Sequence, residues 1–137
     1  MKKYVLYLLS FILIISCSQD KDLETAKIEV NDKKIFNEGI KFSKQKKYRE
    51  AIENFKKIND EFPFSEFSAS AIIYNAYLNF ELNNLDETVL LLTDYINMNP
   101  TGKFSDYAHY MLGMCYYVQI SEPDRDSEFT KRAIEKF

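Results

Sequence analysis

The sequence predicts an all-α fold built of stacked antiparallel helix pairs, and three observations support this prediction. Gly39, Ala76 and Gly113 follow one another at intervals of 37 residues. Pro63 and Pro100 are separated by the same interval. Between these positions apolar residues recur at i, i+3 and i+4, which is the spacing of one face of an α-helix. The 137 residues include only three glycines and three prolines, which argues against a β-sandwich with frequent turns.

Residues 1–16 are predicted to be a secretory signal peptide. Lys2 and Lys3 precede an apolar run from Tyr4 to Ile15 that only Ser10 interrupts. As a helix this run would span about 18 Å, which is short of the roughly 30 Å hydrocarbon core of a bilayer. A short apolar run behind a basic start is typical of a cleaved leader and not of a membrane span.

The leader ends in residues 14–17 (IISC), which resemble a bacterial lipobox. The resemblance implies cleavage before Cys17 and covalent lipid, palmitate included, on that residue; no other cofactor is expected. Several acyl chains on one residue anchor a protein firmly, whereas a single chain does not. Ser18 follows the cysteine in place of Asp, and by resemblance to lipoprotein sorting signals this favours export to the outer membrane. The alternative is an ordinary signal peptide followed by an incidental cysteine.

The remaining chain is expected to consist of a polar tether and a helical domain. Residues 17–32 are rich in charge and poor in apolar periodicity, so they are assigned to the tether; a frayed first helix is the alternative. Residues 33–137 form the domain, with repeats at about 33–63, 69–100 and 105–137. Pro63 and Pro100 are expected to end the second helix of their repeats, and Asp86 and Ser105 to serve as N-caps.

The pattern resembles the tetratricopeptide repeat, which implies a right-handed superhelix of antiparallel helix pairs. The first repeat matches the family's small, aromatic and proline positions at Gly39, Phe42, Ala51, Phe55 and Pro63. The period of 37 exceeds the usual 34 or so residues. Each helix pair has more apolar surface than it can bury alone, so neighbouring repeats must stack. An irregular helical bundle is the alternative.

The second and third repeats depart from this pattern in three places. Asn79 occupies an aromatic position and Thr88 an alanine position. In the third repeat an insertion of eight residues precedes Ala133 and Phe137, which match the second-helix small and aromatic positions. The last helix ends there without a glycine or proline, and we expect the chain to be a shortened form or a fragment of a longer protein; a last helix that itself caps the stack is the alternative.

The order of motifs is similar to that of the BamD-type lipoproteins of the outer-membrane β-barrel assembly machinery. The motifs are the lipobox, the linker at residues 62–67 (FPFSEF), a tyrosine-rich helix at 107–117 and residues 124–126 (DRD) before the last helix. The resemblance extends over nearly all of the chain from Cys17 but over only about half of the family's five repeats. It implies a lipid-anchored, non-enzymatic scaffold on the periplasmic face of the outer membrane. The implied partners are β-barrel assembly subunits and unfolded outer-membrane proteins; a lipoprotein that organises cell-wall enzymes is the alternative.

A partner-binding groove is expected along the first helices of the repeats, which line the concave face in the tetratricopeptide family. Aromatic side chains there would offer large contact areas, and tyrosine adds one polar group. Any one of these residues is as compatible with the core as with the groove. The groove positions carried over from the family are Phe36, Ile40, Ile73, Tyr77, Phe80, Tyr107, Tyr110, Met114 and Tyr117.

Charge is distributed unevenly along the chain. Residues 27–57 carry ten basic and five acidic side chains, whereas residues 58–102 carry seven acidic and no basic ones. A basic cluster surrounds a predicted turn and consists of Lys44, Lys46, Lys47 and Arg49. We expect these side chains to be solvated by water; contact with anionic headgroups or with an acidic partner is the alternative. The net charge of −3 and export from the cytoplasm argue against nucleic-acid binding.

No residue pattern indicates an enzyme or a metal site. His109 is the single histidine, which argues against most His-based catalysis and against a metal site. Cys115 would have no disulfide partner once Cys17 is lipidated, and we expect it to be a small buried apolar residue. Phosphate-binding loops and nucleophile elbows, which depend on glycine, are missing from the sequence.

Overall fold

The computed structural model describes residues 20–120 and 127–137, and the regular structure in these residues is entirely α-helical. The chain divides into two compact units, residues 1–31 and 32–137. The predicted signal peptide and Cys17 lie outside the described residues. None of the helices within the described ranges is both long enough and apolar enough to cross a membrane.

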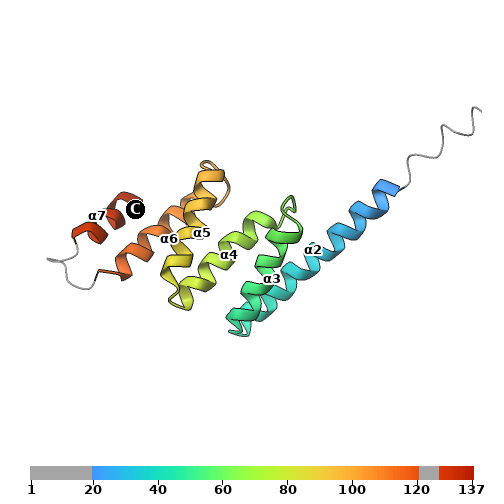
Figure 1. The fold of residues 1–137 in the computed structure, drawn as a ribbon, viewed down its shortest axis with the longest axis horizontal. Helices are drawn as coiled ribbons and strands as arrows, with labels where there is room; N and C mark the ends of the chain where they lie inside the picture. Colours follow the sequence, from blue (N-terminus) through green and yellow to red (C-terminus); the bar gives the residue numbers. More distant parts are fainter. Residues whose placement is uncertain (1–19, 121–126) are drawn as a thin grey trace, which may run out of the picture. The chain divides into compact units, whose positions relative to one another are not determined.

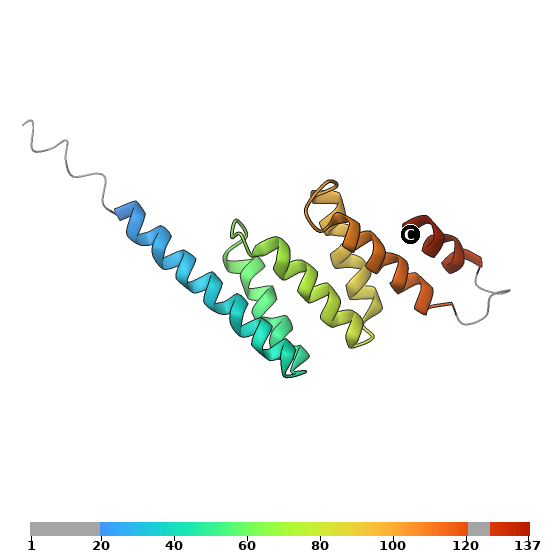
Figure 2. The same cartoon turned by 180° about the vertical axis from the view of Figure 1, so that it is seen from behind.

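Within the described residues six helices follow one another, and those from α2 to α6 are joined by short turns (Figures 1 and 2). They are α2 (Asp20–Lys44), α3 (Tyr48–Glu61), α4 (Ser68–Glu81), α5 (Leu85–Met98), α6 (Ser105–Val118) and α7 (Ser127–Lys136). The helix α2 begins inside the segment that was expected to be a tether. From α3 to α7 each helix packs against the next, as expected for stacked helix pairs, so the all-α prediction is confirmed.

The core consists of two clusters that follow the order of the repeats. The first is formed by α2, α3 and α4, and its buried members are Ile35, Ala51, Phe55, Ile58, Ala71 and Leu78. The second is formed by α4, α5 and α6, and its buried members are Ile73, Ala76, Leu92, Tyr95, Ala108, Met111 and Leu112. Because α4 contributes to both clusters, it carries apolar residues on two faces and binds the first repeat to the second.

The 37-residue period is visible in the backbone of the turns. Lys46 and Asn83, one period apart, adopt left-handed conformations with φ of 59° and 60°. The next residue donates its amide to an equivalent carbonyl in both turns: Lys47 N to Phe42 O at 3.0 Å, and Asn84 N to Asn79 O at 2.8 Å. The two helix pairs are therefore closed by the same turn although their side chains differ.

The small residues lie where the helices of a pair approach most closely. A Cβ atom added at Gly39 would lie 2.8 Å from a ring carbon of Phe55, and one added at Gly113 would lie 3.0 Å from the ring of Phe137. The first pair joins α2 to α3, and the second joins α6 to the residue that follows α7. The predicted role of the small positions is therefore confirmed for the first and third repeats.

The two departures of the second repeat form part of one buried hydrogen-bond network. Asn79 donates to the side chain of Asn75 at 2.8 Å and accepts from that of Asn84 at 3.1 Å. Thr88 donates across the helix pair to the Ala76 carbonyl at 3.3 Å and to the Asn84 carbonyl at 3.0 Å. Polar side chains are tolerated in this interior because each of them has a partner.

Neither predicted N-cap acts as one. Asp86 lies in the first turn of α5, whose N-cap is Asn84, so its charge faces the positive end of the helix without capping it. Ser105 is the first residue of α6, and its hydroxyl donates backwards to the Asn99 carbonyl at 2.5 Å. Each helix begins one or two residues earlier than predicted, because the backbone hydrogen bonds of the preceding turn already set where the helix starts.

Candidate functional site

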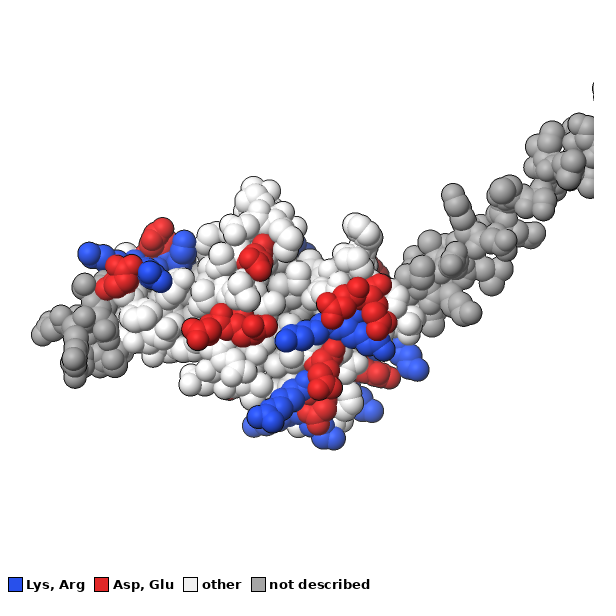
Figure 3. Space-filling view, in the orientation of Figure 1, with Lys and Arg blue, Asp and Glu red and all other residues white. Residues whose placement is uncertain are grey.

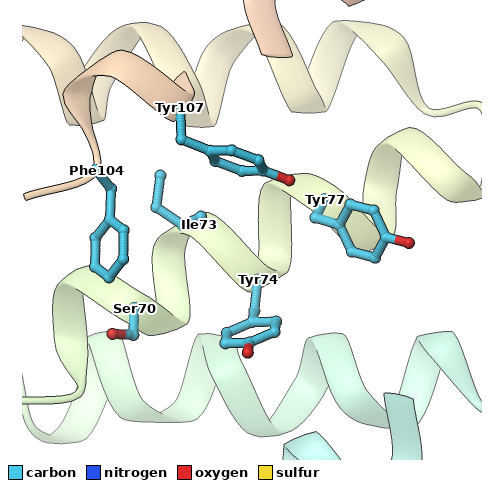
Figure 4. Close-up of a pocket in the computed structure, with 6 residues that line it drawn as sticks. All are labelled: Ser70, Ile73, Tyr74, Tyr77, Phe104 and Tyr107. Carbon is cyan, nitrogen blue, oxygen red and sulfur yellow. The ribbon is translucent and has the colours of Figure 1, made fainter. Parts of the chain in front are cut away.

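A groove of about 410 Å³ lies between α4 and α6, the first helices of the second and third repeats (Figure 4). It is the candidate functional site because it combines an open, largely apolar surface with polar groups at its rim. Its lining residues are Ser70, Ile73, Tyr74, Tyr77, Phe104 and Tyr107.

One face of α4 supplies most of this lining. Ser70, Ile73, Tyr74 and Tyr77 follow the i, i+3, i+4, i+7 spacing, which brings their side chains to one side of the helix. The other wall comes from the start of α6, where Phe104 precedes the helix and Tyr107 lies in its first turn. In Figure 4 the rings of Phe104 and Tyr107 face these α4 side chains across the groove.

The three tyrosines leave between 37% and 40% of their surface exposed, so their rings form the wall and remain accessible. A tyrosine ring offers apolar contact area, and its hydroxyl offers a hydrogen bond to a peptide group. The groove is therefore suited to an apolar side chain flanked by a polar backbone.

The phenol groups of Tyr77 and Tyr107 are held in the neutral form. Partial burial raises the pKa of Tyr77, and the nearby Glu81 carboxylate raises it further through its charge and a hydrogen bond. Burial also raises the pKa of Tyr107, with smaller contributions from neighbouring phenols and Glu81. Both residues therefore remain hydrogen-bond donors at neutral pH.

Three of the nine predicted groove residues line the observed groove: Ile73, Tyr77 and Tyr107. The prediction did not include Ser70, Tyr74 and Phe104. A signal for Ser70 was present, because it lies one period before the predicted groove residue Tyr107, whereas Phe104 lies one period after Phe67, which packs against the core. No comparable signal distinguished Tyr74 from a core residue.

Three further predicted residues lie on α6 beyond the groove. Tyr110 is half exposed, and its ring lies 6.5 Å from that of Tyr107 and 6.0 Å from that of Phe137. Tyr117 is more exposed, and Met114 is partly buried. These residues extend the tyrosine-rich side of α6 towards its end, and their binding role stays a prediction.

The other three predicted residues are packed against the core. Phe36 stacks on Phe67 with ring centroids 4.9 Å apart, and its edge contacts Phe55 and Tyr74. Ile40 packs against the first core cluster and Phe80 against the second. Their positions therefore serve the packing of the repeats.

The charges of the described residues separate as the sequence predicts. Figure 3 shows Lys and Arg gathered around the turn between α2 and α3, while acidic residues dominate the middle of the same face. One ion pair links the two regions, between Lys56 Nζ and Glu87 Oε1 at 3.6 Å. Because both side chains are about half exposed, this pair adds little to stability.

Curated relatives of this chain carry the name outer membrane protein assembly factor BamD. The one from Rickettsia prowazekii (strain Madrid E) is 34% identical over 96 residues, which cover 70% of this chain and 38% of the relative. Those from Caulobacter vibrioides and Pasteurella multocida are 28% and 24% identical over 64% and 100% of this chain, and 28% and 55% of their own lengths. The chain thus spans between about a quarter and just over half of these relatives.

The match to a protein family covers most of the helical chain. Residues 28–137 match the family described as outer membrane lipoprotein (YfiO), and this range includes the groove and both core clusters. The resemblance noted from the lipobox and the linker motif is therefore confirmed. The chain belongs to the YfiO family of outer membrane lipoproteins.

Proposed function

We propose that this protein is a lipid-anchored, non-enzymatic scaffold that helps β-barrel proteins to assemble in the outer membrane. The family match and the names of the relatives support this role. They favour it over the organisation of cell-wall enzymes, for which no comparable match exists among those relatives. The observation that carries the proposal for this chain is the tyrosine-lined groove between α4 and α6.

The proposed ligand of the groove is an extended segment of an unfolded outer-membrane protein or of a partner subunit. A strand destined for a membrane barrel alternates apolar and polar side chains, so one apolar side chain can enter the groove while its backbone remains polar. The hydroxyl of Tyr107 is a neutral donor at the rim and can bond to a carbonyl of such a segment, whereas the hydroxyl of Tyr77 donates to Glu81 and can accept from a peptide N–H. Aromatic residues are common energetic centres of binding surfaces.

The proposed anchor is lipid on Cys17. A Cys17→Ala variant is expected to remain unprocessed and to lose its firm attachment to the membrane. Flotation of membranes in a density gradient measures this. A Cys17→Ala protein that still floats with the outer membrane would contradict the anchor.

Site-specific photo-crosslinking in cells tests the groove. A photoreactive phenylalanine analogue at Tyr77 or Tyr107 is expected to crosslink to unfolded barrel proteins or to assembly subunits. Leu90, which is exposed on α5, is the matched control position and should give no such product. Equal crosslinking at all three positions would show that the groove is not selective.

Co-purification from detergent-solubilised envelopes tests the wider role. Barrel-assembly subunits are expected to accompany the protein. The recovery of cell-wall synthases without those subunits would favour the alternative function.

A further inference from the structure

We propose that the turns joining α3 to α4 and α5 to α6 form an edge that contacts the membrane, with Phe64 inserted into the headgroup region of a phospholipid bilayer. The edge is defined by Phe64, Met98 and Lys103. The inference rests on the proposed lipid anchor at Cys17, because that anchor keeps the protein at a bilayer surface.

Phe64 is presented to solvent by an ordered turn. Its side chain is fully exposed, at 101% of the reference area, whereas Phe62 and Phe67 on either side are partly buried. Phe67 stacks on Phe36, and its amide donates to the Ser65 hydroxyl at 3.0 Å. The flanking residues therefore hold the turn in place, and the side chain of Phe64 is held in the solvent. Aromatic side chains held in this way are favoured at the interface between a bilayer and water.

The turn lies beside the residue at which the chain enters the repeat unit. The Ser65 hydroxyl donates to the Asp32 carboxylate at 2.5 Å, and Asp32 is buried. Asp32 follows Cys17 by fifteen residues, and those from Asp20 onwards belong to α2. Even if the three residues that precede α2 were fully extended, they and the twelve helical residues would span at most about 30 Å. A lipid on Cys17 would therefore hold this turn no more than about 30 Å from the bilayer, within reach of its surface.

The second turn adds to the same edge, as both views of the fold show (Figures 1 and 2). Met98, at the end of α5, leaves 67% of its surface exposed. Lys103 lies over the ring of Phe104, with Nζ 5.0 Å from its centroid. Between Lys57 and Arg125 it is the single Lys or Arg of the sequence. An ammonium group beside exposed apolar side chains complements lipid phosphates.

The opposite edge serves as an internal comparison. The basic turn after α2 follows Asp32 by twelve helical residues, which is about 18 Å along the helix axis. Figure 3 shows its charges on the side of the molecule away from the two turns, whose protruding tips are mostly white in that view. The exposed carboxylate of Glu66 limits insertion at the first turn to its tip. The edge therefore touches the bilayer superficially.

Tryptophan fluorescence tests the proposal, because the chain contains no tryptophan. The probe is lipidated full-length protein with Phe64→Trp, reconstituted in vesicles of phosphatidylethanolamine and phosphatidylglycerol. Its emission is expected to shift to shorter wavelength and to be quenched several-fold more by brominated lipids than in the matched control. The control is Gln45→Trp, an exposed position in the opposite turn, whose emission should remain that of tryptophan in water.

The outcomes separate this proposal from the anchor. If both variants float with vesicles and the tryptophan of the Phe64→Trp variant stays in water, the membrane edge is wrong and the anchor stands. If neither variant floats, the anchor is wrong and the edge falls with it. An emission shift of the Phe64→Trp variant that requires added envelope proteins would assign the turn to a protein partner and overturn the proposal.

Discussion

The ring of Phe55 occupies the space that a side chain at Gly39 would need: an added Cβ would lie within 2.9 Å of two of its carbon atoms. Phe55 is completely buried and packs against the rings of Phe36 and Tyr74 at centroid distances of 5.6 and 5.3 Å. A displacement of Phe55 would therefore disturb two more aromatic residues. This contact sets the distance between α2 and α3.

Gly39→Ala is expected to destabilise the fold. Overpacking costs about 1–3 kcal/mol, and the better helix propensity of alanine returns about 1 kcal/mol. Gly113→Ala is the matched control, because the facing ring of Phe137 leaves 66% of its surface exposed and can move away. We expect this control to be neutral or slightly stabilising. Chemical denaturation of both variants measures the difference, and equal losses would contradict the argument.

Lys46→Gly is expected to stabilise the turn between α2 and α3 by about 0.5–1 kcal/mol. Lys46 has a φ of 59°, in a region that a side chain disfavours and glycine does not. Asn83→Gly, in the equivalent turn, should gain less because asparagine tolerates this conformation better. Midpoints of thermal unfolding compare the two variants. A larger gain at Asn83 than at Lys46 would show that backbone strain does not decide the effect.

The parts of the structure that were predictable are those that recur with the period. The contact between a glycine and a phenylalanine ring occurs in both the Gly39–Phe55 and the Gly113–Phe137 pair, because the two helices of each repeat must pack at a similar distance. The groove was only partly predictable, because the crossing of α4 and α6 decides whether an aromatic side chain faces solvent or the core. Phe36 and Ile73 occupy equivalent positions, yet only Ile73 lines the groove.

The buried hydrogen-bond network of the second repeat was not predictable from the sequence. Asn79 and Thr88 each depart from the repeat pattern, but the pattern does not show that their side chains belong to one network. Asn79→Leu is expected to cost about 1–3 kcal/mol, since it leaves the buried Asn75 side chain without its donor. A double variant that also carries Asn75→Leu should lose less than the sum of the two single variants, because both partners are then apolar. A double-mutant cycle by urea denaturation measures the coupling. Strict additivity would rule out the network as a source of stability.

Cys115 is expected to make stability depend on pH at alkaline pH. Burial raises the pKa of this thiol to about 11 from its ordinary value near 9. The unfolded chain therefore releases the proton first, and stability contributed by the neutral thiol is complete below about pH 9 and falls as the pH rises towards 11. In Cys115→Ala this contribution is missing. The other titrating groups are present in both the parent and the Cys115→Ala protein. They include Tyr77 and Tyr107, whose pKa values are raised.

The free energies of unfolding of the parent and of Cys115→Ala, measured at pH 7, 9 and 10.5, test this expectation. The parent is expected to be more stable at pH 7, because the substitution leaves a small cavity, and its advantage should narrow above pH 9. Thiol labelling gives an independent reading in a Cys17→Ser background, in which Cys115 is the remaining thiol of the sequence. The folded protein should react slowly at pH 8, and the unfolded protein quickly. Fast labelling of the folded protein, together with a constant difference in stability across this pH range, would show that the thiol is not buried as the structure has it.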